Sequence, residues 1–183
     1  TLVTNDDIKR CALENTGSPA ATSTRRESVG HLEGVDSSSG FGFTPTFLLT
    51  LDLSRTGMDA RAFNMIAKSL GENNMLTTLR LERSGVTDEG ATALSGALQA
   101  NRNSMLMALY LDENRIDDTG GQQIGQLLES NATLTTLSLA KNSIGNDGAS
   151  AIAYALGINY TLTSLSLGDN KVGALGVDSL ARV

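Results

Sequence analysis

The chain has 183 residues, with 14 basic against 20 acidic side chains and a formal net charge of −6. This acidic balance, with a pI near 4.7, argues against a general nucleic-acid binder, whose footprint is a basic stripe, and against docking on anionic membranes. No apolar run in the sequence approaches the ~20 residues that a membrane helix needs.

Residues 1–45 are expected to form an N-terminal capping helix (Thr1–Asn15), interpreted as a remnant half-repeat, followed by an irregular loop without a period (Thr16–Pro45). Cys11 is the only cysteine, which rules out disulfide-bonded caps within the chain and favours a reducing, cytoplasmic compartment. The only histidine, His31, lies in the loop without catalytic or metal-binding companions.

From residue 46 onward the sequence is periodic. Five similar units begin at Leu48, Leu76, Leu106, Leu134 and Leu162, so that successive units start 28, 30, 28 and 28 residues apart. A period in this range is typical of repeat solenoids, in which each unit buries its apolar face only by stacking on its neighbours.

The fourth unit shows the pattern of one repeat most clearly. Leu137 and Leu139 alternate with polar residues, which predicts a short strand buried on one side. Asn142 follows where the chain must turn, and its amide can satisfy turn backbone groups. Asn146 is a candidate N-cap for a helix. That helix carries an apolar stripe at Ala149, Ile152, Ala153 and Leu156.

Three units share the frame L-x-x-L-x-L-x-x-N-x-I/V. It stands as Leu106, Leu109, Leu111, Asn114, Ile116; as Leu134, Leu137, Leu139, Asn142, Ile144; and as Leu162, Leu165, Leu167, Asn170, Val172. In this frame the chain resembles the leucine-rich repeat superfamily, specifically its ribonuclease-inhibitor type. The resemblance implies an α/β leucine-rich repeat solenoid, or horseshoe, with a concave parallel β-sheet and convex α-helices. It covers a domain of about five repeats at residues 46–183.

Four carboxylates lie close together in the third unit: Asp112, Glu113, Asp117 and Asp118. Such a group could indicate calcium. The repeat frame favours a simpler interpretation, because Asp117 and Asp118 fall just ahead of a helix, where they would cap it and favour its positive end. We therefore expect no metal site.

Other motifs also have simple explanations. Gly90, Gly120, Gly148 and Gly176 share one repeat position and lack the spacing of a phosphate loop, so we expect them to let helix and strand layers approach. Asn131 and Asn159 match the glycosylation acceptor pattern, but we interpret both as helix stops. No Ser/His/Asp or Cys/His set is present, so we expect no catalytic residue, no cofactor and no enzyme.

The remaining candidate for function is the concave surface, formed by strand residues between the buried leucines. Its predicted partner-binding residues are Asp52, Arg80, Glu82, Tyr110 and Asp112. Arginine and tyrosine are enriched in binding hot spots, and adjacent strands would bring Arg80 and Tyr110 together. In the alternative interpretation, both are simply solvated strand residues.

The sequence thus favours a non-catalytic protein-binding module or scaffold. Proteins that look like this include the ligand-sensing halves of nucleotide-binding immune receptors and the tropomodulin cytoskeletal caps. Two alternatives stay open: a regulator of a small GTPase, because the Ran GTPase-activating protein has similar repeats, and a structural protein that self-associates through its open carboxyl end. The expected partner is a protein of unknown identity, with no nucleic acid and no membrane.

Overall fold

The computed structural model of the chain describes residues 48–102 and 104–183, where short strands alternate with helices. The strands are β1 (Thr50–Asp52), β2 (Thr78–Arg80), β3 (Ala108–Tyr110), β4 (Thr136–Ser138) and β5 (Ser164–Ser166). The helices are α2 (Ala60–Leu70), α3 (Asp88–Ala100), α4 (Asp118–Ser130), α5 (Asn146–Leu156) and α6 (Ala174–Leu180). The predicted capping helix and loop of residues 1–45 lie outside the described residues.

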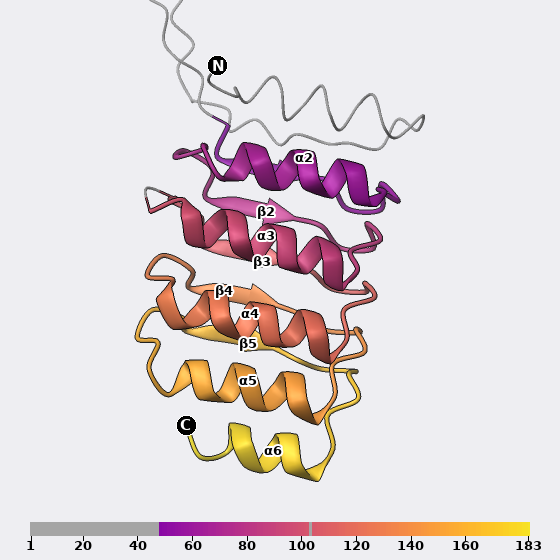
Figure 1. Cartoon of the computed structure of the whole chain (residues 1–183), viewed down its shortest axis with the longest axis vertical. Helices are drawn as coiled ribbons and strands as arrows, with labels where there is room; N and C mark the ends of the chain where they lie inside the picture. Colours follow the sequence, from indigo (N-terminus) through magenta and orange to yellow (C-terminus); the bar gives the residue numbers. More distant parts are fainter. Residues whose placement is uncertain (1–47, 103) are drawn as a thin grey trace, which may run out of the picture.

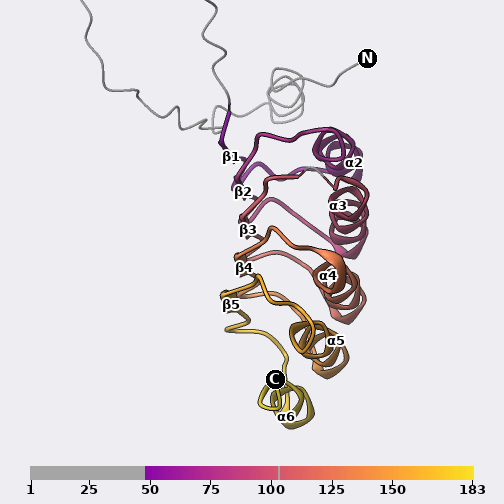
Figure 2. The ribbon, with the colours of Figure 1, turned by 90° about the vertical axis from the view of Figure 1, so that its left-hand side faces the viewer.

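The strands form one parallel sheet in chain order, β1-β2-β3-β4-β5. Equivalent leucines are in register across it: Leu51, Leu79, Leu109, Leu137 and Leu165. The repeats stack along the long axis of the molecule (Figure 1). Seen from the side, the strands line one surface and the helices fan out along the other (Figure 2). The predicted leucine-rich repeat solenoid, with an inner sheet and outer helices, is confirmed.

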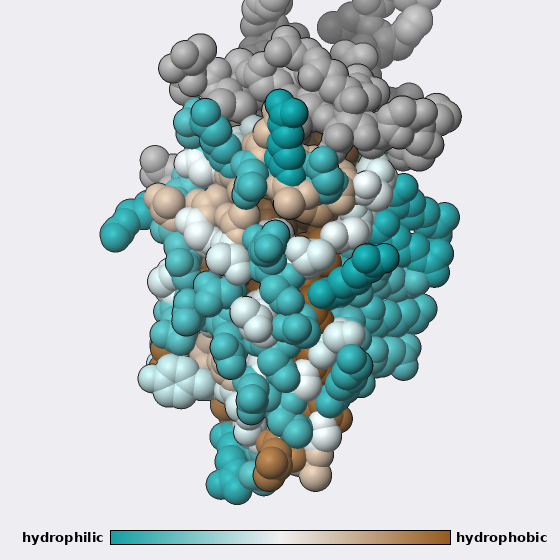
Figure 3. All heavy atoms as spheres, turned by 45° about the vertical axis from the view of Figure 1, so that its right-hand side comes forward, coloured by the Kyte–Doolittle hydropathy of each residue, from teal (hydrophilic) through white to brown (hydrophobic). Residues whose placement is uncertain are grey.

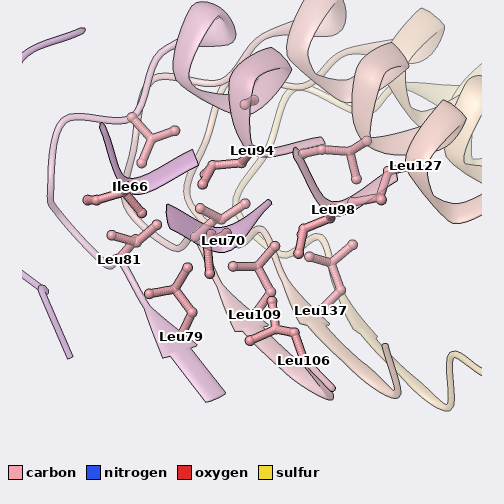
Figure 4. Close-up of a cluster of buried hydrophobic side chains, with 14 of the residues drawn as sticks. Ile66, Leu70, Leu79, Leu81, Leu94, Leu98, Leu106, Leu109, Leu127 and Leu137 are labelled. Atoms are coloured by element: carbon pink, nitrogen blue, oxygen red, sulfur yellow. The ribbon is translucent and has the colours of Figure 1, made fainter. Parts of the chain in front are cut away.

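The core lies between the sheet and the helices (Figure 4). Leu79, Leu109 and Leu137 are at most 2% exposed, and burying one such side chain contributes about 1.5–3 kcal/mol. The equivalent Leu165, in the outermost repeat, is only partly buried. The buried leucines of the strands and the apolar residues of the helices belong to one cluster, as expected for a stack with one continuous core.

The asparagines of the repeat frame hold the turns that follow the strands. The amide group of Asn142 donates to the carbonyls of Leu111 and Leu139 at 2.9 and 3.0 Å, and its side-chain oxygen accepts from the backbone N–H of Ile116 at 3.1 Å. At the same position in the second repeat, the Ser84 hydroxyl donates to one carbonyl, that of Leu81. The predicted role of Asn142 in the turn is thus confirmed, and serine replaces it only in part.

A second set of asparagines follows the helices. Asn131 is the C-cap of α4. The prediction that Asn159 ends its helix is wrong, because α5 stops at Leu156 and Gly157 is its C-cap. The Asn159 side chain instead joins two repeats: it donates to the carbonyls of Leu128 and Asn131 and accepts from the N–H of Leu162. Its amide is therefore occupied by the fold.

The starts of the helices are capped partly across repeats. Asp117 caps its own helix α4, since its carboxylate accepts from the N–H of Thr119 at 2.7 Å. Asp118 is the first residue of α4, and its carboxylate accepts from the N–H groups of Gly145 and Gly148 at the start of α5, at 2.8 and 2.7 Å. Asp88 of α3 does the same for α4, accepting from Asp117 and Gly120.

The predicted N-cap role of Asn146 is therefore wrong for its own helix. Gly145 is the N-cap of α5, and Asn146 is the first helical residue. Its side-chain oxygen accepts from the N–H groups of Gly173 and Gly176, both at 2.9 Å, at the start of α6. Each of Asp88, Asp118 and Asn146 thus places a hydrogen-bond acceptor at the positive end of the next helix, where it is favourable.

A glycine near the start of each of α4, α5 and α6 leaves room for the capping side chain of the preceding repeat. A Cβ at Gly120 would lie 2.5 Å from the Asp88 carboxylate and 2.6 Å from the Ile116 side chain, too close for any larger residue without movement. Gly120 thus permits close approach, but its tight neighbours are Asp88 of the preceding helix and the turn residue Ile116, not the strand layer that the sequence predicted.

The cap at Asp117 predicts a pH dependence of stability. The hydrogen bond from the Thr119 backbone N–H holds the pKa of Asp117 below its ordinary value. Because the folded-state pKa is lowered, the carboxylate stabilises the fold above its unfolded pKa of about 3.9, and this contribution is lost as pH falls through the folded pKa. Asparagine at this position keeps a cap without the charge.

We therefore expect the wild type to gain stability over Asp117→Asn as pH rises from below about 3 to neutral. Urea unfolding of both proteins across this range measures the difference in free energy of unfolding. A difference that stays constant with pH would contradict the assignment.

Candidate partner-binding face

The inner surface of the sheet places four of the five predicted binding residues side by side. Strand register aligns Asp52 of β1 with Arg80 of β2, and Arg80 with Tyr110 of β3. Glu82 lies just after the end of β2. These positions alternate with buried leucines, so their side chains face away from the core.

Arg80 is the centre of this group. Its guanidinium forms ion pairs with Glu82 and, at 3.9 Å, with Asp52. Its Cζ atom also lies 4.6 Å from the centroid of the Tyr110 ring, a cation–π arrangement. Side chains from three strands therefore meet at one guanidinium, and we call Asp52, Arg80, Glu82 and Tyr110 the Arg80 cluster.

The hydroxyl of Ser54 extends the cluster at its edge. The Ser54 hydroxyl lies within 2.6 Å of both the Asp52 and the Glu82 carboxylates, and the Ser54 backbone N–H donates to Asp52 at 2.9 Å. These bonds fix both acids that hold Arg80. The sequence interpretation did not assign Ser54 a role, although it occupies the same repeat position as Glu82.

Asp112, the fifth predicted residue, bonds to residues of the fourth repeat. Its carboxylate accepts from the Ser138 hydroxyl at 2.5 Å and from the Ala140 backbone N–H at 2.9 Å. These contacts tie the third repeat to the fourth. Asp112 thus borders the Arg80 cluster on the same face without a polar contact to Arg80 among the interactions described.

The cluster remains accessible although it is internally bonded. The side chains of Arg80, Asp52 and Glu82 are 42%, 30% and 19% exposed. Since their geometry is already fixed by mutual contacts, a partner that docks on them would lose less side-chain entropy than on free side chains. The arrangement offers a partner a carboxylate pair, a guanidinium edge and an aromatic ring.

The four clustered carboxylates of the third repeat have separate partners. Asp112 binds the fourth repeat, Asp117 and Asp118 cap helices, and Glu113 pairs with Arg83 and Lys141. Within residues 48–102 and 104–183, no group of His, Cys, Asp and Glu side chains could hold a metal ion.

In the same ranges, no helix combines the length and apolarity that crossing a membrane requires.

The ion pairs of Glu113 are a feature that the sequence interpretation missed. Glu113 lies between Arg83 of the second repeat and Lys141 of the fourth, with the Lys141 pair at 3.3 Å. The hydrogen bond from Arg83 lowers the pKa of the Glu113 carboxyl. All three residues occupy the same repeat position, which was the available signal in the sequence.

A sequence model of the leucine-rich repeat matches residues 72–95, 102–125, 130–153 and 159–181. These matches span more than half of the chain and follow the stacked units of the structure. The chain belongs to the leucine-rich repeat family.

Two curated human proteins share part of this sequence. Leiomodin-3 is 28% identical over 85 residues, which is 46% of this chain and 15% of leiomodin-3. Capping protein, Arp2/3 and myosin-I linker protein 3 is 37% identical over 75 residues, 41% of this chain and 5% of that protein. The chain therefore corresponds to only a small part of either relative.

Two solved structures have the same fold. One, described as leiomodin-1 actin-binding site 2, matches with a TM-score of 0.62 and 24% identity, covering 74% of this chain and 80% of that one. The tropomodulin C-terminal domain of Caenorhabditis elegans matches with a TM-score of 0.62 and 10% identity, covering 96% and 90%. At these identities the likeness concerns the fold.

Proposed function

We propose that the chain is a non-catalytic protein-binding module of the cell interior, and that its partner docks on the inner face of the sheet at the Arg80 cluster. The observation that carries this proposal is the meeting of Asp52, Glu82 and Tyr110 on one partly exposed guanidinium. Arginine and tyrosine are the residue types that most often carry binding energy at protein interfaces.

The repeats outside the cluster make a simpler surface. Further along the inner face stand Thr136, Ser138, Ser164 and Ser166. Small hydroxyl side chains of this kind suit hydrogen bonding at the rim of an interface. The distribution supports a contact centred on the second and third repeats, with the later repeats contributing complementarity.

We further propose actin as the partner to test first. The solved structure of leiomodin-1 carries an actin-binding site in its description, and this chain has the same fold. The sequence relatives include leiomodin-3 and a protein named as a linker of capping protein, Arp2/3 and myosin-I. The hypotheses of a small-GTPase regulator and of self-association gain no support from these relatives.

The experiment titrates the fluorescently labelled chain with purified monomeric actin and sediments it with actin filaments. We expect saturable binding by the wild type and at least about tenfold weaker binding by an Arg80→Ala, Tyr110→Ala double variant, since truncating a hot-spot residue costs about 2 kcal/mol or more. Thr136→Ala with Ser164→Ala, on the same face, serves as the matched control and should bind like the wild type.

Thermal unfolding of the variants establishes that each is folded. Equal actin binding by the wild type and the double variant would show that the Arg80 cluster consists of solvated strand residues, as the alternative holds. No binding by the wild type would reject actin as the partner. Stimulated hydrolysis with a panel of small GTPases would then test the regulator hypothesis.

A further inference from the structure

A second surface follows the turns that leave the strands. In each repeat the third residue beyond the strand has a left-handed backbone, and in each repeat it is charged. These residues are Arg55, Arg83, Glu113, Lys141 and Asp169, with φ between 52° and 62°. They are the only residues other than glycine with positive φ in the described part of the chain.

The backbone of this position serves the fold. The N–H of Arg83 donates to the carbonyl of Asp112 at 3.0 Å, and the N–H of Lys141 donates to that of Gly168 at 2.8 Å. The left-handed turn therefore serves to make these hydrogen bonds between repeats. Glycine would adopt the same conformation without the steric cost that a residue with a Cβ incurs. Conformational cost at a recurring position motivates a functional hypothesis.

The side chains of this position contribute little to stability. Arg83 and Lys141 are 51% and 54% exposed, and ion pairs at such exposure are worth little. Arg55 and Asp169 are also exposed and take part in no ion pair within the described residues. The charge at this position is therefore better explained by binding to a molecule from solution than by stabilisation of the fold.

Two further cations lie two residues beyond this row, Arg115 and Lys171, both exposed. Together the seven residues make a strand-exit rim with five cations and two anions: Arg55, Arg83, Glu113, Arg115, Lys141, Asp169 and Lys171. The rim is thus basic on a chain whose net charge is −6. Hydrophilic side chains dominate this edge of the molecule, which is turned forward in Figure 3.

Glu113 shows how a carboxylate is accommodated on the rim. It pairs with Arg83 of the preceding repeat and Lys141 of the following one. Among the described residues, Arg55, Arg115 and Lys171 form no ion pair with a carboxylate. We propose that the strand-exit rim binds an acidic segment of a protein partner, whose Asp and Glu side chains reach the cations of successive repeats as Glu113 does.

The surroundings of the rim favour a peptide over a polyphosphate or an anionic membrane. The helix starts just beyond it carry the carboxylates of Asp88, Asp117, Asp118 and Asp147. A broad polyanion would meet this acidic row, whereas a single peptide strand can follow the narrow basic strip. Opposite charges in parallel rows also orient such a peptide.

The test measures fluorescence anisotropy of a labelled oligoglutamate peptide with the full chain at low and high salt. We expect binding that weakens with salt and that falls about tenfold or more in Arg115→Glu, Lys171→Glu, because two attractive pairs become repulsive. Glu113→Gln should bind about two- to fivefold more tightly, since Arg83 and Lys141 become available. An uncharged oligoglutamine peptide of the same length is the matched control and should not bind.

Three results would overturn the proposal: unchanged binding by the charge-reversed variant, weaker binding by Glu113→Gln, or an oligonucleotide that displaces the peptide more effectively than oligoglutamate does. The Arg80→Ala, Tyr110→Ala variant should bind the peptide like the wild type, so this test is independent of the proposed inner-face site.

The variant Lys141→Gly adds a separate readout. It should bind the peptide more weakly while its melting temperature stays equal or rises. A lower melting temperature would assign Lys141 a structural role instead.

Discussion

Replacing Leu137 with alanine is expected to lower the free energy of unfolding by about 2–5 kcal/mol. Leu137 lies in β4, inside the stack, and is 1% exposed. Its removal leaves a cavity against helices that are held by repeats on both sides, so the surroundings have little freedom to collapse. Urea denaturation followed by circular dichroism measures the loss.

Leu165 is the matched control for this prediction. It occupies the same repeat position in β5, in register with Leu137, and is only partly buried. Leu165→Ala should therefore cost less than Leu137→Ala, because less apolar contact is lost. Equal losses for the two variants would contradict the proposed continuous core, in which burial increases toward the inner repeats.

Asn142→Ala is expected to cost about 1–3 kcal/mol or more, because it removes side-chain partners from buried backbone groups. The carbonyls of Leu111 and Leu139 would lose a donor, and the N–H of Ile116 would lose its acceptor. Asn142 is 8% exposed, so water cannot readily replace these bonds. The same denaturation experiment applies.

Asn142→Ser distinguishes hydrogen bonding from packing. Ser84 occupies the equivalent position in the second repeat and bonds to the Leu81 carbonyl at 2.6 Å. Serine at 142 should therefore retain part of the stability that alanine loses. Ser143→Ala, in the neighbouring position, should be close to neutral. If Asn142→Ala were as stable as the wild type, the turn would not depend on the asparagine.

The repeat pattern predicted the strands and the helices, and the resemblance to leucine-rich repeats implied their parallel stacking. Leu137 and Leu139 fix which side of a strand is buried, and a two-residue alternation leaves no other choice. The same logic placed Asp52, Arg80 and Tyr110 on one face in adjacent strands, and the structure has them there. That this face binds a partner stays a proposal.

Contacts that cross between repeats could not be predicted in the same way. Capping rules are local, so Asn146 was interpreted as the cap of its own helix. The Asn146 side-chain oxygen instead accepts hydrogen bonds at the start of α6, in the next repeat. The pattern of a single repeat does not show which residues of the next repeat lie beside it. The Glu113 ion pairs also join neighbouring repeats, and only the aligned positions of Arg83, Glu113 and Lys141 could have indicated them.

The most direct test of the inner-face proposal is amide hydrogen exchange of the chain, measured by mass spectrometry with and without saturating monomeric actin. We expect added protection in peptides that contain β1, β2 and β3, centred on Arg80 and Tyr110, with little change on the outer surface of α4 and α5. Protection confined to the helices, or no change in any strand peptide, would contradict it.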